Sequence, residues 1–237
     1  MIEWKRLTNP EVAALDRRLP VLMPVGLIEA HGPHLSLSVD IDTAEFFSRA
    51  ICERTGAVLA PGLAYGFADE MREYPGTIGL SVATFTTVIA EIGSMFCYHG
   101  FQRLIFISGH GANKAPVEIA FWTIWDTYPD ARLACWNWWT EGGISGIHHA
   151  DKGETEVAAV TGAVYHPDRA VDFKIDKPWY KLRSRHAISP DSGGINGAPS
   201  QAVLEQGVRN RNKVVEVLSA KVAEIMRADG LAIPAAE

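Results

Sequence analysis

The chain has 237 residues, of which 47% are hydrophobic and 21% charged, and its formal net charge is −6. A chain of this length can bury the core of one domain, so we expect a single domain over residues 1–237. The acidic balance argues against a nucleic-acid or anionic-membrane surface, which would need clustered lysine and arginine.

Three cysteines, Cys52, Cys97 and Cys135, lie far apart among apolar or helical neighbours. This arrangement predicts buried thiols in a reducing compartment rather than disulfides. No apolar run in the sequence reaches the length of a signal peptide or of a membrane span, which needs about 20 residues. We therefore expect a cytoplasmic protein that acts without a membrane.

Hydrophobic periodicity and turn residues predict helices that alternate with strands along most of the chain. The predicted helices cover about residues 9–18, 42–54, 84–98, 116–128, 154–161 and 199–228, and the predicted strands about 19–25, 57–60, 103–108 and 131–136. Such alternation is typical of a parallel sheet covered on both faces. Residues 61–79 form a long loop rich in glycine and proline, and a loop of this length is usually functional.

The stretch that follows the first long strand contains Glu29, His31, His34 and Asp40. Glutamate, histidine and aspartate are the ligand types that suit a hydrolytic zinc or manganese ion. Alternate side chains of an extended chain point to the same side, so Glu29 and His31 can face one point. A polar loop whose histidines cap backbone groups explains these residues alone about equally well.

Further candidate residues follow two other predicted strands. His110 lies between two glycines after the strand 103–108, and glycines let backbone and ligand approach closely. His148, His149 and Glu154 offer acid–base groups, and Glu154 is either a metal ligand or a charge at a helix start. Because ligands bind beyond the carboxyl ends of parallel strands, these segments predict one shared site.

Aromatic and polar residues near these segments have more than one possible role. Trp136, Trp138 and Trp139 line a pocket for a cyclic substrate, or the alternating pair Trp136 and Trp138 packs one strand face. Glu70 in the long loop contacts the substrate or faces solvent. Asn113 is expected to cap the helix that follows it.

Three other polar residues are weaker candidates for the functional site. Ser108 stands near His110 but lacks the Gly-x-Ser-x-Gly context of serine hydrolases. Asp151 and Lys152 are expected on the surface. No Gly-x-Gly-x-x-Gly or P-loop pattern follows a predicted strand, so a nucleotide phosphate is not expected.

With these residues in view, the sequence resembles the creatininase (creatinine amidohydrolase) family along nearly its whole length. Five ordered motifs carry the resemblance: Glu29-Ala-His31-Gly-Pro-His34-Leu with Asp40 after it, Tyr74-Pro-Gly-Thr-Ile-Gly-Leu80, Ser108-Gly-His-Gly-Ala-Asn113, His149-Ala-Asp-Lys-Gly-Glu154-Thr, and Gly197-Ala-Pro-Ser-Gln-Ala-Val-Leu-Glu-Gln-Gly207. Together the five are a strong family signal.

The resemblance implies a three-layer α/β/α sandwich with a mostly parallel central sheet. It also implies a centre of two divalent ions, zinc or manganese, in a homo-oligomer that is often a hexamer. By position, Glu29 and His110 would hold one ion, His31 the other, and Asp40 would bridge them. The implied partners are a small-molecule substrate and further copies of the chain, with no nucleic acid.

The resemblance also locates where this chain departs from the family pattern. The glutamate that completes the second ion in creatininase falls at Ala112, so Glu154 is expected to replace it. His149 matches the family's catalytic histidine. A tryptophan that helps to sandwich creatinine falls at Ser145, and Met71 replaces a frequent histidine, which argues against creatinine itself as the substrate.

These expectations combine into a metal-dependent hydrolase in which an activated water attacks the carbonyl of a small polar, cyclic substrate. Cleavage of an amide carbon–nitrogen bond is the first expectation, and His149 would protonate the leaving group. Ring-opening carbon–carbon hydrolysis of a cyclic diketone, as in inositol breakdown, and metal binding without turnover are the alternatives. Substrate contacts are expected from His34, Glu70, Trp136 and His148.

Overall fold

A parallel five-stranded sheet in the order β1-β3-β2-β4-β5 forms the centre of the fold. The computed structural model of the chain describes residues 1–68, 70–174 and 192–234. The strands are β1 (Ile2–Glu3), β2 (Val21–Val25), β3 (Val58–Leu59), β4 (Arg103–Ser108) and β5 (Arg132–Asn137). The α-helices are α1 (Asn9–Ala14), α2 (Val39–Thr55), α3 (Val82–Tyr98), α4 (Lys114–Thr127), α5 (Trp138–Glu141), α6 (Lys152–Ala158) and α7 (Leu204–Ala228). The short 3-10 helices are η1 (Trp4–Arg6), η2 (Glu70–Glu73), η3 (Gly111–Asn113), η4 (Pro167–Arg169) and η6 (Pro199–Gln201).

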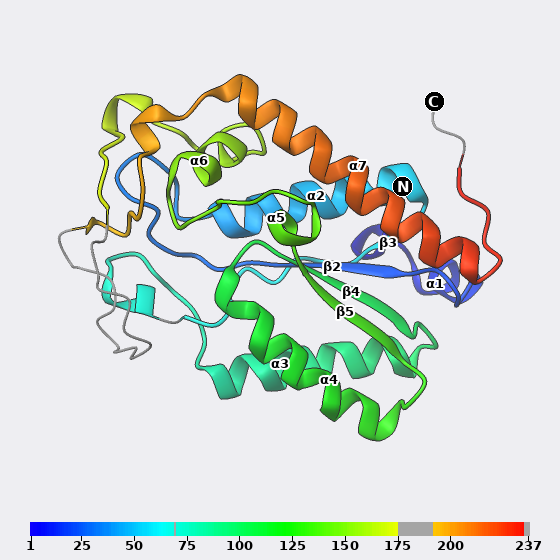
Figure 1. Cartoon of the computed structure of the whole chain (residues 1–237). Coiled ribbons are helices and arrows are strands. Elements are labelled where there is room, and N and C mark those ends of the chain that lie inside the picture. The colour runs from blue at the N-terminus through cyan, green and yellow to red at the C-terminus, as the bar shows by residue number, and fades with distance from the viewer. Residues whose placement is uncertain (69, 175–191, 235–237) are drawn as a thin grey trace.

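The sheet separates two layers of helices, as Figure 1 shows. Helices α3 and α4 cover one face, and α2, α5, α6 and α7 lie on the other. Along β4, Leu104 and Phe106 join the core beneath α3 and α4, whereas Ile105 and Ile107 join the core beneath α2 and α7. This alternation explains why the strand is apolar at successive positions, and the three-layer α/β fold predicted above is confirmed.

The order of the strands creates a crevice beside β2. From β2 the chain passes through α2 to β3 on one side, and it returns through α3 to β4 on the other side of β2. Ligands of open parallel sheets bind at such a reversal, beyond the carboxyl ends of the strands. The segments after β2 and β4 are therefore placed to build a site together.

The first turn of α2 lies directly against the ends of these two strands. A Cβ atom on Gly26 would come within 2.5 Å of the Cα atom of Ile41, and one on Gly109 within 1.9 Å of the carbonyl oxygen of Asp40. Only glycine allows so close an approach of two backbones. The two glycines thus bring Asp40, in the first turn of α2, to the carboxyl edge of the sheet.

Several predicted boundaries differ from the observed ones. Helix α2 begins at Val39, before the predicted residue 42, and α7 begins at Leu204 because Pro199 and its neighbours form η6 instead. The sequence predicts neither β1 nor α5, which are two and four residues long. Elements this short contain only about one period of a hydrophobic pattern, so periodicity does not reveal them.

The end of the sheet opposite the crevice is fastened by Asp229, which follows α7. Its Oδ2 atom lies 2.5 Å from Nε of Arg103 and also pairs with Arg132, so α7 is tied to the first residues of β4 and β5. The three cysteines are buried free thiols, as predicted. Within the ranges that the structure describes, no helix combines the length and apolar character that a membrane span requires.

Candidate metal centre

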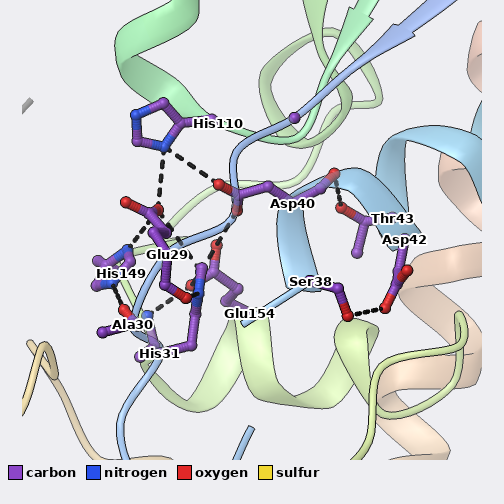
Figure 2. A network of polar contacts seen from close by, with 12 residues as sticks. Glu29, Ala30, His31, Ser38, Asp40, Asp42, Thr43, His110, His149 and Glu154 are labelled. Atoms are coloured by element: carbon purple, nitrogen blue, oxygen red, sulfur yellow. Dashed lines mark hydrogen bonds and ion pairs between the residues drawn. The ribbon is translucent and has the colours of Figure 1, made fainter. Parts of the chain in front are cut away.

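Six side chains from three parts of the chain converge at the crevice. Glu29, His31 and Asp40 come from the loop after β2 and the first turn of α2, His110 from the turn after β4, and His149 and Glu154 from the loop before α6 and its first turn. Figure 2 shows these side chains turned toward one another. They include every residue that the sequence analysis predicted as a metal ligand.

The ligand atoms form three close groups, two of which share Asp40, while the third joins Glu29, His31 and His149. In the first group, Nδ1 of His110 lies 3.0 Å from Oε1 of Glu29 and 3.3 Å from Oδ2 of Asp40. In the second, Nε2 of His31 lies 3.3 Å from Oδ1 of Asp40 and 3.6 Å from Oε2 of Glu154. Within each group one ligand atom per residue lies within 4.8 Å of the others.

Several of these buried atoms lack a hydrogen bond. Among the described residues, no hydrogen-bond partner reaches either carboxylate oxygen of Glu29, Nε2 of His31 or Oδ2 of Asp40. Buried polar atoms in this state are costly unless something else satisfies them. Because carboxylate oxygens and imidazole nitrogens are the donors that zinc and manganese prefer, the residues present fit divalent cations.

Burial and mutual charge shift the protonation of the cluster strongly. Burial raises the pKa of Glu29 to about 7 and that of Glu154 to about 8. Burial disfavours the charged form of His31, but Asp40 and Glu154 outweigh it and raise the pKa to about 10. For Asp40, burial is outweighed by His31 and His110, which hold its pKa well below the ordinary value. The metal-free cluster therefore keeps protons at neutral pH.

His149 has a different environment. Its Nε2 atom lies 2.8 Å from the carbonyl oxygen of Ala30, to which it donates in the neutral tautomer, and its Nδ1 atom lies 3.5 Å from Oε1 of Glu29. Burial and the neighbouring charge of His31 lower the pKa of His149 to about 3. The ring is therefore neutral, with its Nδ1 lone pair facing the cluster.

A cavity of about 190 Å³ opens onto the cluster. One part of its wall is apolar and is formed by Met71, Ala112, Trp139 and Ile147. His148 contributes a further polar group, and among the described residues that line the cavity there is neither lysine nor arginine. The cavity thus offers a small substrate an apolar wall opposite the carboxylates and imidazoles.

Two predicted substrate contacts lie away from this cavity. His34 is fully buried, and its Nε2 atom lies 2.9 Å from the hydroxyl of Thr155, so its contact is with α6. Trp136 packs against the core beneath α7 and Trp138 belongs to that core, although Trp138 stands in α5 rather than on the strand. Their placement does not support contact with the substrate. The side chain of Glu70, also a predicted contact, lies outside the described part of the structure.

Three polar residues hold backbone atoms in place, and for Asn113 and Asp151 this role differs from the expected one. The side chain of Asn113 does not cap a helix but accepts a hydrogen bond from Phe67 N and donates one to Gly26 O. Asp151 is buried, and its Oδ1 atom caps α6 by accepting from the backbone N–H of Glu154. The hydroxyl of Ser108 donates to the carbonyl of His110 and fixes the turn. The predictions for Asn113 and Asp151 missed backbone partners that only the fold supplies.

Trp139 lines the cavity, whereas Trp136 is the tryptophan predicted to contact the substrate. Continued alternation along β5 would have placed Trp136 and Trp138 on one face and Trp139 on the other. The strand ends at Asn137, and the short helix α5 turns Trp139 toward His110 and its neighbours. Ile147 was not considered, because nothing in its local sequence marks it.

Comparison with known proteins shows which protein family this chain belongs to. The family model of creatininase, described as creatinine amidohydrolase, matches residues 5–222. A mycofactocin precursor peptide peptidase of Mycobacterium ulcerans is 30% identical over 86% of this chain and 84% of its own. Creatinine amidohydrolase of Pseudomonas putida is 34% identical, but the match spans 48% of this chain and 44% of the relative.

Solved structures agree with this assignment at the level of the fold. A creatininase variant described as a Zn-Zn type superimposes with a TM-score of 0.83 at 22% identity, covering 94% of this chain and 97% of the other. A manganese form of creatininase has a TM-score of 0.81 at 23% identity, with 94% and 98% of the two chains covered. The chain is therefore a member of the creatininase family of metal-dependent hydrolases.

Proposed function

We propose that this protein hydrolyses the amide carbon–nitrogen bond of a small polar substrate with the help of two divalent ions, zinc or manganese. One ion would be held by Glu29, Asp40 and His110, and the other by His31, Asp40 and Glu154. The observation that carries the proposal is the pair of buried ligand groups that share Asp40 and leave carboxylate oxygens without hydrogen bonds. Ions of this kind supply an activated water and polarise a carbonyl.

Glu154 completes the second group in this proposal. Ala112, the position at which the family resemblance places a glutamate, lies in the cavity wall and offers no ligand atom. Glu154 instead places its Oε2 atom near His31, and its backbone is fixed by the cap of Asp151. A ligand from α6 thus replaces one from η3, which leaves the cavity wider beside Ala112.

His149 moves the proton in this proposal. Its Nε2–H is held by the carbonyl of Ala30, so Nδ1 is the nitrogen that can accept a proton and later pass it to the leaving amine. Its partial exposure of 21% faces the cavity, so a substrate can reach it. The apolar wall with Trp139 would orient the substrate against this nitrogen.

The names of two relatives favour carbon–nitrogen cleavage. One relative is an amidohydrolase and another a peptide peptidase, and both names denote hydrolysis of amide bonds. A third relative, 3-dehydro-scyllo-inosose hydrolase of Thermotoga maritima, is 26% identical over 92 residues and keeps ring-opening carbon–carbon hydrolysis as a second candidate.

Product analysis separates the two candidates. The chain would be stripped of metal, reloaded with zinc or manganese, and incubated with a panel of lactams, formamides, short peptides and cyclic diketones. Release of ammonia, amine or formate supports the proposal, and an acyclic keto acid supports the second candidate. Metal uptake without turnover of any member would favour metal binding alone.

A further inference from the structure

The motif from Gly197 to Gly207 has no part in the centre described above, since none of its residues lines the cavity. It packs against α6, the seven-residue helix that presents Glu154. The contacts occur at both ends of that helix. The inference drawn from them rests on the proposed function, because it concerns how Glu154 reaches a metal ion.

Gly197 fits against the first end of α6. A Cβ atom on Gly197 would lie 2.3 Å from the Cβ atom of Asp151, so any larger residue must displace Asp151. Asp151 in turn accepts a hydrogen bond of 3.0 Å from the backbone N–H of Glu154. The position of the cap, and with it the first turn of α6, therefore depends on the absence of a side chain at residue 197.

Gly207 fits against the other end in the same way. A Cβ atom there would lie 2.0 Å from the carbonyl oxygen of Glu156, a backbone atom that cannot rotate away. Glu156 is only 2% exposed, and its Oε1 atom accepts a hydrogen bond of 3.1 Å from the backbone N–H of Val203. The buried carboxylate thus ties α6 to the residue that precedes α7, and the metal centre does not use it.

Glu154 itself is held tightly between these contacts. Its Oε2 atom accepts a hydrogen bond of 2.5 Å from the backbone N–H of Ala150. Ala150 has a φ of 50°, and it is the one non-glycine residue in the described ranges with a positive φ. Such backbone strain persists only where the surroundings enforce it. Metal–oxygen distances tolerate changes of about 0.2 Å, so a small shift of α6 would matter.

We propose that Gly197, Gly207 and Glu156 are positioning residues that hold α6 where Glu154 can complete the second metal group. They act through α6 and touch neither substrate nor metal. Loss of one of them should weaken the ion held by His31, Asp40 and Glu154. The ion held by Glu29, Asp40 and His110 should be unaffected, because none of its ligands lies on α6.

The test compares metal binding by the full-length chain and by its variants. Each protein is stripped with a chelator and titrated with Zn²⁺ alone in competition with a chromophoric chelator, and bound metal is counted by mass spectrometry. The variants are Gly207→Ala and Glu156→Ala, with Glu156→Gln as the conservative replacement that keeps an oxygen acceptor for Val203. Glu205→Ala, an exposed change on the same turn of α7, is the control.

Gly207→Ala and Glu156→Ala are expected to weaken the second ion about 10-fold or more and to leave the first unchanged. Glu156→Gln and Glu205→Ala should bind both ions like the wild type. If Gly207→Ala does not fold, the difference in affinity for the second ion between Glu156→Ala and Glu156→Gln tests the positioning role.

The results that would overturn the inference are of two distinguishable kinds. A wild-type chain that binds two ions, together with folded variants that bind both equally well, removes the positioning role alone. Equal weakening of both ions, or a general loss of thermal stability without selective loss of the second, does the same. A wild-type chain that takes up one equivalent or none removes the proposed two-ion function and the inference with it.

Discussion

Asp40 is the residue on which the proposed centre depends most, because its two oxygens face different groups. Oδ1 lies 3.3 Å from His31, and Oδ2 lies 3.3 Å from His110. Removing this carboxylate should therefore affect both ions, whereas removing Glu154 should affect one. This difference separates a shared ligand from an ordinary one.

Asp40→Ala is expected to lower the affinity for both ions and the amide-hydrolysing activity about 100-fold or more. Glu154→Ala should reduce the zinc content by one ion. Asp42→Ala is the matched control, because Asp42 lies on the same turn of α2 but hydrogen-bonds Ser38 outside the centre. Metal analysis of the three variants measures the number of bound ions, and activity assays measure the loss of hydrolysis. Retention of two ions by Asp40→Ala would contradict the shared-ligand assignment.

The protonation of the metal-free cluster predicts how metal binding depends on pH. Glu29, with a pKa of about 7, and Glu154, with a pKa of about 8, are protonated below these values, and an ion must displace those protons. The affinity for Zn²⁺ should therefore rise as the pH increases from about 6 to about 9. Calorimetry in buffers of different ionisation enthalpy should show net proton release. An affinity that is flat or falls over this range is the contrary result.

At the scale of single elements, the contact between α2 and the strand ends is the feature that places Asp40. Gly109→Ala would drive a Cβ atom into the Asp40 carbonyl, so we expect a loss of about 3 kcal/mol of unfolding free energy or a failure to fold. Gly111→Ala is the control, because the nearest atom to its Cβ, in Trp139, lies 3.8 Å away. Chemical denaturation of both variants measures the difference. Equal stability would show that α2 can move without cost.

How much the sequence predicts also varies by element. Strand β4 was predicted at its observed bounds, because a run of apolar residues between turn signals marks a central parallel strand. The convergence of Glu29, His110 and Glu154 followed from strand ends and from the family resemblance. The start of α2 was predicted three residues too late, because tertiary contact with two glycines, rather than a local capping signal, fixes that end.

Side-chain partners across the fold were harder to predict than ligand types. Asn113 looked like a helix cap, but its amide joins Gly26 to Phe67, residues far away in sequence. Asp151 looked like a surface residue because it is charged, yet it is buried at the end of α6. Residue type and spacing can be read from the local sequence. These hydrogen bonds cannot, because they depend on which distant backbone atoms the fold places beside the side chain.

For the molecule as a whole, the fastening at Asp229 should be visible in stability. Asp229→Asn removes the charge that pairs with Arg103 and Arg132, and we expect it to cost roughly 1–2 kcal/mol and to lower Tm by about 2–8 °C. Hydrogen bonds from Arg103 and Arg132 lower the pKa of Asp229 below its ordinary value of 3.8. The contribution is therefore present above pH 3.8 and lost as the pH falls through the lower folded value. Thermal melts of both proteins at neutral pH and at about pH 3 test this, and a constant difference between them would contradict it.

The proposed ligands lie in three separate segments of the chain, which follow β2, β4 and β5, and α6 belongs to the last of them. An ion bound among them acts as a reversible cross-link that closes the long loop between β2 and α6. Without it, α6 should open by local unfolding while β4 stays protected. Amide hydrogen exchange should therefore quicken in residues 152–158 of the metal-free chain and remain slow in residues 103–108. Under the proposed function, metal supply would then govern the folding of α6 as well as the chemistry of the centre.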